Sequence, residues 1–75
     1  MAGQNTDVQT VSMGDGWVNK VSGLQVGGIF RTQEEAIAAG RELAMQSASE
    51  HSIHGKDGTI REKTSYGNDP REIRG

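Results

Sequence analysis

The chain has 75 residues, two histidines, one proline and no cysteine, with a formal net charge of −2. This length allows one domain at most, with a thin hydrophobic core. The lack of cysteine excludes disulfides and thiolate metal sites, and the charge argues against a dedicated nucleic-acid binder. No apolar run approaches the ~20 residues that span a bilayer, and no secretory signal is visible, so we expect a cytoplasmic protein without membrane contact.

The first half of the chain predicts three strands. Residues 1–7 are small and polar and are expected to form a flexible N-terminus. Strand-like residues follow at 8–13, 17–21 and 24–31, and glycine-containing turns separate them. The pair Gly27-Gly28 predicts a bulge or a close backbone approach in the third strand.

Thr32 opens the clearest helix, which we predict over residues 33–48. The run Thr32-Gln33-Glu34-Glu35 fits a capping box, in which the Thr32 hydroxyl accepts a hydrogen bond from the Glu35 amide. Small and apolar residues recur at helical spacing. Most of them are alanine or glycine, so this stripe can lie close against a sheet: Ala36, Ile37, Gly40, Leu43, Ala44 and Ala48.

The second half predicts a β-hairpin from residues 50–54 and 59–63. The pair Asp57-Gly58 is a strong hairpin signal and favours a type I′ turn. Residues 67–75 are expected to form an irregular tail, with Tyr66 pinning part of it onto the body. The prediction is a single α+β domain over residues 8–66, in the order β-β-β-α-β-β, with one antiparallel sheet and one helix packed on one face.

Alternation along the strands places apolar residues on both faces of the predicted sheet. One short helix covers one face, and the other carries Val11, Met13, Val18 and Ile29. This pattern predicts self-association, as a homodimer, through the second face or through a free strand edge. The alternative is a monomer with a few exposed aliphatic side chains.

Few residues of the sequence are spaced as a catalytic site would require. His51 and His54 are three residues apart, so on a strand they point to opposite faces and cannot share a metal; we expect them on the surface or partly packed. No serine lies in a nucleophile-elbow context, and the glycines do not form a phosphate loop. We therefore expect no enzyme, no metal and no cofactor.

Nucleic-acid binding is the more specific alternative, because the strands of a small sheet can enter a groove of DNA. Its candidate contacts are Lys56, Arg61 and Lys63 on the second hairpin, with Arg71 and Arg74 on the tail. Acidic residues are interleaved among them, and the chain has few aromatic residues for stacking. The competing interpretation is a solvated, charge-alternating hairpin that protects a sheet edge.

Four segments carry a resemblance to a known family: Trp17-Val18, the helix start Thr32-Gln33-Glu34-Glu35-Ala36, the run Ala39-Gly40-Arg41-Glu42-Leu43-Ala44, and the terminal IHGKDGTIREKTSYGNDP. Together they resemble a family of small bacterial proteins that share a conserved domain of unknown function and the motif H-G-x-D-G-x-I-R-x-x-x-x-Y-G-x-D-P. The resemblance covers roughly residues 16–70 and implies a bacterial or phage source and a compact α+β domain, with no established activity or cofactor. Many members continue with further prolines, whereas this chain continues with Arg71-Glu72-Ile73-Arg74.

The motif and its basic neighbours define the candidate binding surface. Its members are His54, Lys56, Asp57, Arg61, Lys63, Tyr66 and Asp69. The same motif also fits a purely structural lock, with Tyr66 packed on the hairpin and Asp69 or Arg61 holding the tail. The leading hypothesis is a non-enzymatic domain that acts through protein contacts, with its own copy or an unknown protein; the alternative is weak nucleic-acid binding through the second hairpin.

Overall fold

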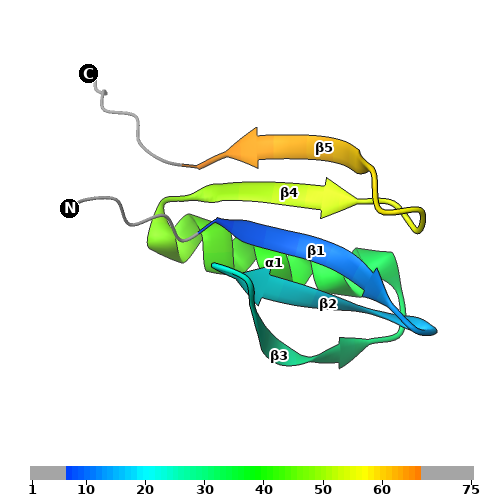
Figure 1. Ribbon diagram of the computed structural model, residues 1–75. Coiled ribbons are helices and arrows are strands. Elements are labelled where there is room, and N and C mark those ends of the chain that lie inside the picture. Colours follow the sequence, from blue (N-terminus) through cyan, green and yellow to red (C-terminus); the bar gives the residue numbers. More distant parts are fainter. Residues whose placement is uncertain (1–6, 67–75) are drawn as a thin grey trace, which may run out of the picture.

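A computed structural model describes residues 7–66, which form one helix and a five-stranded sheet (Figure 1). The predicted order β-β-β-α-β-β is confirmed, and the α+β class with it. The strand and helix bounds fall within two residues of those predicted. The elements are β1 (Val8–Met13), β2 (Gly16–Val21), β3 (Leu24–Phe30), α1 (Gln33–Ser47), β4 (Glu50–His54) and β5 (Ile60–Ser65).

The first three strands form an antiparallel meander. β1 pairs with β2 in unbroken register from Val8↔Val21 to Met13↔Gly16. The register between β2 and β3 shifts between Trp17 and Asn19, opposite the glycine pair of β3. Gly27 has a φ of +76°, a conformation that side chains with a Cβ rarely adopt. The irregularity predicted from Gly27-Gly28 is therefore confirmed.

The prediction of an all-antiparallel sheet is wrong, because β4 pairs with β1 in parallel. The strand order is β3-β2-β1-β4-β5. β1 and β3 run in the same direction, since both are antiparallel to β2. α1 returns across the sheet, so β4 starts at the same end as β1 and runs alongside it. The connection β3-α1-β4 is thus a crossover over two strands, and the two hairpins meet in one mixed sheet.

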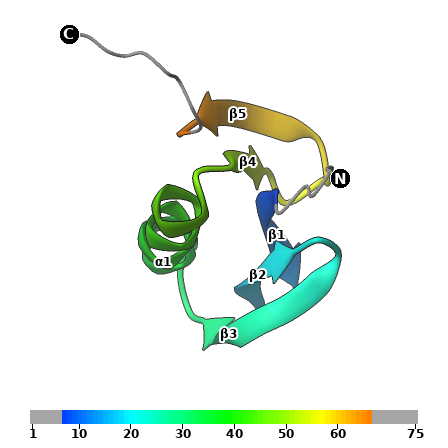
Figure 2. The same cartoon turned by 90° about the vertical axis from the view of Figure 1, so that its left-hand side faces the viewer.

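α1 lies on the concave face of the curved sheet, and no helix covers the convex face in residues 7–66 (Figure 2). The Thr32 hydroxyl accepts a hydrogen bond from the Glu35 amide at 3.2 Å, which confirms the predicted cap. The helix ends at Ser47. The next residue, Ala48, caps it in a left-handed conformation with a φ of 53°. This helix is too short and too polar to cross a membrane, and residues 7–66 contain no other.

The core between α1 and the sheet is made of small side chains. Ala36, Gly40 and Ala44 form the buried stripe of the helix. Gly40 marks the closest approach, because a Cβ there would lie 2.6–2.9 Å from polar atoms on three strands. The fully or nearly buried hydrophobic residues of the described chain on the α1 side of the sheet are Val8, Trp17, Ala36, Ala44 and Ile53, whereas Val18 is buried on the opposite face. Trp17 is therefore the largest apolar side chain in this core.

The β4–β5 loop is one residue longer than the four residues left between the predicted strands. It spans residues 55–59, and the Gly58 amide donates to the Gly55 carbonyl at 3.0 Å. Gly58 has a φ of +89°, whereas Asp57 is not among the residues with positive φ. A type I′ turn needs positive φ at both central residues, so this part of the prediction is wrong. Hydrogen bonds from Thr59 to the Asp57 carboxylate hold Asp57 in place instead.

Candidate functional site

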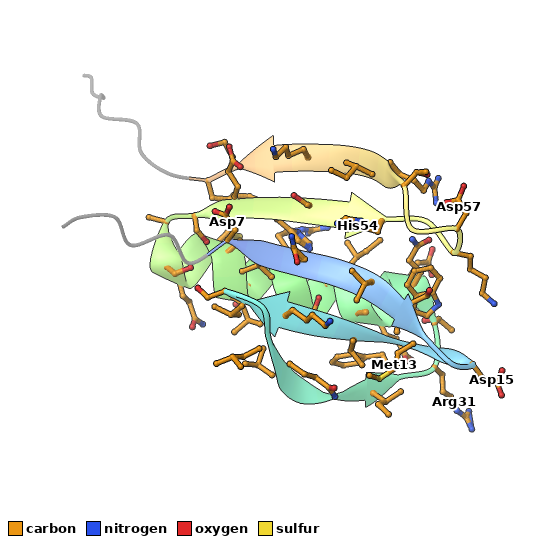
Figure 3. The ribbon with its side chains drawn as sticks, in the orientation of Figure 1. Asp7, Met13, Asp15, Arg31, His54 and Asp57 are labelled. Atoms are coloured by element: carbon orange, nitrogen blue, oxygen red, sulfur yellow. The ribbon has the colours of Figure 1, made fainter. Side chains whose placement is uncertain are left out.

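An open groove lies between the start of α1 and the β4–β5 loop. Its volume is about 540 Å³. The loop supplies most of the lining, while β2 and α1 supply the opposite wall. Figure 3 places Asp57 at this end of the molecule, beyond the end of β4. The groove is lined by Trp17, Gln33, Gly55, Lys56, Asp57, Thr59 and Arg61.

Gln33 joins the two walls of this groove. Its Nε2 donates to the His54 carbonyl at 3.0 Å, and its Oε1 accepts from Arg61 Nη1 at 3.2 Å. A carbonyl can only accept and a guanidinium can only donate, so these two partners fix the orientation of the amide. Gly55 leaves room for the arginine stem, since a Cβ there would lie 3.3 Å from Arg61 Cδ. Arg61 is thus positioned by a neutral side chain and by the backbone.

Asp57 organises the loop itself. Its Oδ1 accepts the Thr59 backbone N–H at 3.1 Å and the Thr59 hydroxyl at 2.8 Å. Both bonds favour the charged carboxylate, so the pKa of Asp57 is lowered from 3.8, with the backbone bond as the larger cause. The carboxylate that the sequence motif supplies is therefore engaged with its own loop and not with a neighbouring cation.

The two cations of the groove have no ion-pair partner in residues 7–66. The ion pair found in this part of the chain joins Lys63 Nζ to Glu50 Oε1 at 3.6 Å, at a different place on the hairpin. Arg61 and Lys56 are both exposed. Their charges, with that of Asp57, leave the groove with a net positive charge.

A bacterial family matches nearly all of the described chain. The profile described as an uncharacterized protein conserved in bacteria (DUF2188) matches residues 8–66. The chain belongs to this family. The DUF2188 match begins at the first residue of β1 and ends at Tyr66, so it includes every element described above and the whole groove. No curated protein and no solved structure matches the chain significantly.

The residues of the predicted binding surface do not all lie together in this DUF2188 domain. Lys56, Asp57 and Arg61 come together in the groove. His54 lies next to it, where its Nδ1 donates to the Gly58 carbonyl at 3.1 Å. Lys63 lies farther along β5 beside Glu50.

Tyr66, a further member of that predicted surface, directly follows the end of β5. The backbone N–H of Tyr66 donates to the Ser49 carbonyl at 3.0 Å, which holds the end of β5 to the start of β4. Asp69, Arg71 and Arg74 lie outside the described residues, as does the predicted tail over 67–75. The structural lock is therefore described only as far as Tyr66.

The sheet face opposite α1 carries the four predicted apolar residues of the DUF2188 domain. Val11 and Val18 are register partners and so share a face. A Cβ at Gly16 would lie 2.6 Å from Ile29 Cγ2, which places Ile29 on that same face. Met13 and Ile29 are 42% and 64% exposed, whereas Val18 is fully buried. We call Val11, Met13, Val18 and Ile29 the convex apolar patch.

A row of polar side chains crosses the same face nearer the other end of the strands. The register pairs Lys20 with Gln9, Gln9 with Ser52, and Ser52 with Lys63. Glu50 lies beside this row and pairs with Lys63. The convex face is therefore apolar at one end and charged at the other.

Sequence reasoning missed a buried polar network between α1 and the sheet. Asn19 Nδ2 donates to the Ala36 carbonyl at 2.9 Å, and the Thr10 hydroxyl donates to Asn19 Oδ1 at 2.6 Å. His51 Nε2 lies 2.7 Å from Thr10 Oγ1. His51 is 2% exposed, so the expectation of a surface or partly packed side chain is wrong for this histidine. The sequence carries a signal for this network, because Thr10 and Asn19 occupy strand positions on the helix-facing side, among apolar residues.

The groove residues that sequence reasoning missed are Trp17, Gln33, Gly55 and Thr59. Trp17 lies on β2 and Gln33 at the start of α1, and no sequence spacing brings either residue to the hairpin loop. Within residues 7–66, no three histidine, aspartate or glutamate side chains gather closely enough to hold a metal ion.

Proposed function

We propose that this DUF2188 domain is a non-enzymatic interaction module that binds a second copy of itself through the convex apolar patch. The observation that carries the proposal is the exposure of two large aliphatic side chains on the helix-free face: Met13 at 42% and Ile29 at 64%. Pairing of two such faces removes both side chains from water, which is favourable in proportion to the apolar area buried.

The charge pattern of the face favours a second copy as the partner. The convex apolar patch contains no charged residue, so two copies related by a two-fold axis meet there without like-charge repulsion. The charged row with Lys20 and Lys63 lies toward the other end of the strands and remains hydrated. The domain has few large core residues and no disulfide, and oligomerisation is a usual reinforcement for so small a chain.

Light scattering coupled to size exclusion, run over a range of protein concentrations, tests the proposal. We expect a mass that approaches twice the 8.0 kDa of one chain. The variant Ile29→Lys should remain monomeric because it would bury a charge at the contact. Leu24→Lys is the matched control: Leu24 is 71% exposed on the same strand but pairs with Val21, on the face that carries α1. A wild-type mass of one chain at every concentration would refute the homodimer.

Nucleic-acid binding by the second hairpin is the second candidate function. It is favoured by the two cations, Lys56 and Arg61, that no described carboxylate neutralises. It is weakened by Lys63, which pairs with Glu50 instead of extending that positive surface. A gel shift that weakens with added salt and with Lys56→Gln would support it, because phosphate contacts release counterions. No shift at low salt would exclude it.

A further inference from the structure

We propose that the groove at the β4–β5 loop binds a carboxylate side chain from an acidic peptide segment, with Arg61 as the principal contact. This inference concerns a different surface from the convex apolar patch and does not rest on self-association. Four features of the groove carry it: a positioned arginine, a second cation, an aromatic wall and a carboxylate that is already engaged.

Arg61 is held in place before any ligand arrives. Its Nη1 donates to Gln33 Oε1 at 3.2 Å, and its stem lies against Gly55. Gln33 is in turn fixed by the His54 carbonyl at 3.0 Å. A guanidinium has five N–H donors in a rigid fork that matches a carboxylate. Among residues 7–66, only the bond to Gln33 uses one of the Arg61 donors. Preorganisation of this kind lowers the entropic cost of binding.

The charge of Arg61 is not neutralised by its surroundings. Its positioning partner is an amide, and it makes no ion pair with residues 7–66. Lys56 adds a second positive charge on the loop. Asp57 adds a negative charge, but both a backbone N–H and a hydroxyl of Thr59 donate to its carboxylate. An anionic group in the groove therefore meets two cations that make no ion pair with residues 7–66.

Trp17 gives the groove an apolar wall. It is 8% exposed, so most of the indole is fixed in the core and the rest faces outward at the groove. A peptide can lay its aliphatic atoms on this wall while its carboxylate reaches the cations.

A carboxylate is favoured over a phosphate backbone for two reasons. The negative charge of Asp57 at the loop would repel a densely charged strand. The cations of the hairpin do not form a continuous stripe, since Lys63 is paired with Glu50 at 3.6 Å. Nucleic acids are bound by series of phosphate contacts, whereas a single acidic side chain needs one forked partner.

Trp17 is the one tryptophan of the chain, so its fluorescence reports on the groove. The full chain would be titrated at low ionic strength with acetyl-tetraglutamate amide, and in parallel with acetyl-tetraglutamine amide and a thymidine oligonucleotide. Amide spectra of the ¹⁵N-labelled protein would follow Gly55, Gly58 and Thr59 in the same titrations. We expect saturable changes with the glutamate peptide and none with the glutamine peptide.

Three variants test the role of Arg61. Arg61→Gln should weaken binding of the glutamate peptide about tenfold to a hundredfold, as expected for loss of a charge-assisted hydrogen bond. Arg41→Gln, on the exposed side of α1, removes the same charge outside the groove and should leave affinity within about twofold, because distant surface charges are screened. Gln33→Glu should abolish binding, because the new carboxylate would pair with Arg61 from within the groove, although it can no longer donate to the His54 carbonyl.

The proposal is overturned if the glutamate peptide shifts neither the fluorescence nor the amide signals. It is also overturned if Arg61→Gln and Arg41→Gln weaken binding equally, which would indicate a general charge effect. Tighter binding of the oligonucleotide than of the peptide, lost in Lys56→Gln, would assign the groove to nucleic acid instead.

Discussion

His51 Nε2 donates its hydrogen to Thr10 Oγ1 across 2.7 Å, and this direction follows from the rest of the network. The Thr10 hydroxyl has one hydrogen, which Asn19 Oδ1 accepts at 2.6 Å. Asn19 Nδ2 faces the Ala36 carbonyl, so the amide orientation is fixed. Nε2 of His51 therefore carries a hydrogen. The chain of donors runs from β4 through β1 and β2 into α1.

Loss of the Thr10 hydroxyl should destabilise the fold. Thr10→Val keeps the shape but leaves the His51 N–H and Asn19 Oδ1 without their partner in a buried site. Each unsatisfied buried group costs about 1–3 kcal/mol, so we expect a loss of at least 2 kcal/mol in the free energy of unfolding. Urea denaturation measures it. Thr64→Val, at a half-buried threonine of β5, is the matched control, and an equal loss in both variants would contradict this role.

Stability should depend on pH through His51. Burial, and then the charge of Arg41, lower the pKa of His51 below its ordinary value of 6.5. The unfolded chain therefore binds a proton near pH 6.5 that the folded chain does not bind. The contribution of His51 is fully present above pH 6.5 and is lost as pH falls toward the lowered pKa of the folded state.

Urea denaturation at a series of pH values checks this dependence. His51→Gln retains an N–H at the end of the side chain but does not titrate, so its unfolding free energy should vary less with pH between 6.5 and the lowered pKa. A wild-type slope in His51→Gln would show that another group is responsible.

Gly40→Ala should destabilise the domain even though alanine is the better helix former. A Cβ at Gly40 would lie 2.6 Å from Asn19 Oδ1, 2.7 Å from His51 Nε2 and 2.9 Å from Thr10 Oγ1. These atoms are fixed by mutual hydrogen bonds and cannot move aside independently. Overpacking of a filled core costs about 1–3 kcal/mol, which exceeds the roughly 1 kcal/mol gained in helix propensity.

Gly28→Ala is the matched control for that substitution. A Cβ at Gly28 would have nothing within 4 Å, and Gly28 is not among the glycines with positive φ. Its unfolding free energy should be unchanged or higher by up to about 1 kcal/mol, because alanine restricts the unfolded chain. Thermal and urea denaturation of both variants measure the difference. If both substitutions have the same effect, close packing at Gly40 is not the cause.

Local signals predicted the elements of this fold well, whereas contacts between distant segments were not predictable from them. The Thr32 cap and the alternation of Val8–Met13 specify structure within a few residues, and both are found as predicted. The parallel pairing of β4 with β1 depends on the direction in which α1 returns, and no short motif encodes that direction.

The same distinction applies to the candidate site. The Asp57-Gly58 turn pointed to the hairpin loop, and three of the predicted binding residues meet there. Gln33 and Trp17 complete the groove from elsewhere in the chain, and their roles depend on the β4–β5 loop lying beside the start of α1. The polar network under Gly40 likewise joins three strands to the helix, so its partners are visible only in the folded chain.

The Asp57 carboxyl should titrate below its ordinary pKa of 3.8, because both the backbone N–H and the hydroxyl of Thr59 donate to Oδ1. Thr59→Val removes the hydroxyl bond and keeps the backbone bond, so it should raise the pKa of Asp57 part of the way back. Since the folded pKa is the lower one, the stability contributed by Asp57 is present above pH 3.8 and is lost as pH falls through the lowered value.

Carboxyl ¹³C NMR titrations of the wild type and Thr59→Val measure this shift directly. The larger share of the shift comes from the backbone bond, so the variant should keep a lowered pKa and an intact loop. An Asp57 titration curve that is the same in both proteins would show that the Thr59 hydroxyl does not stabilise the carboxylate in solution.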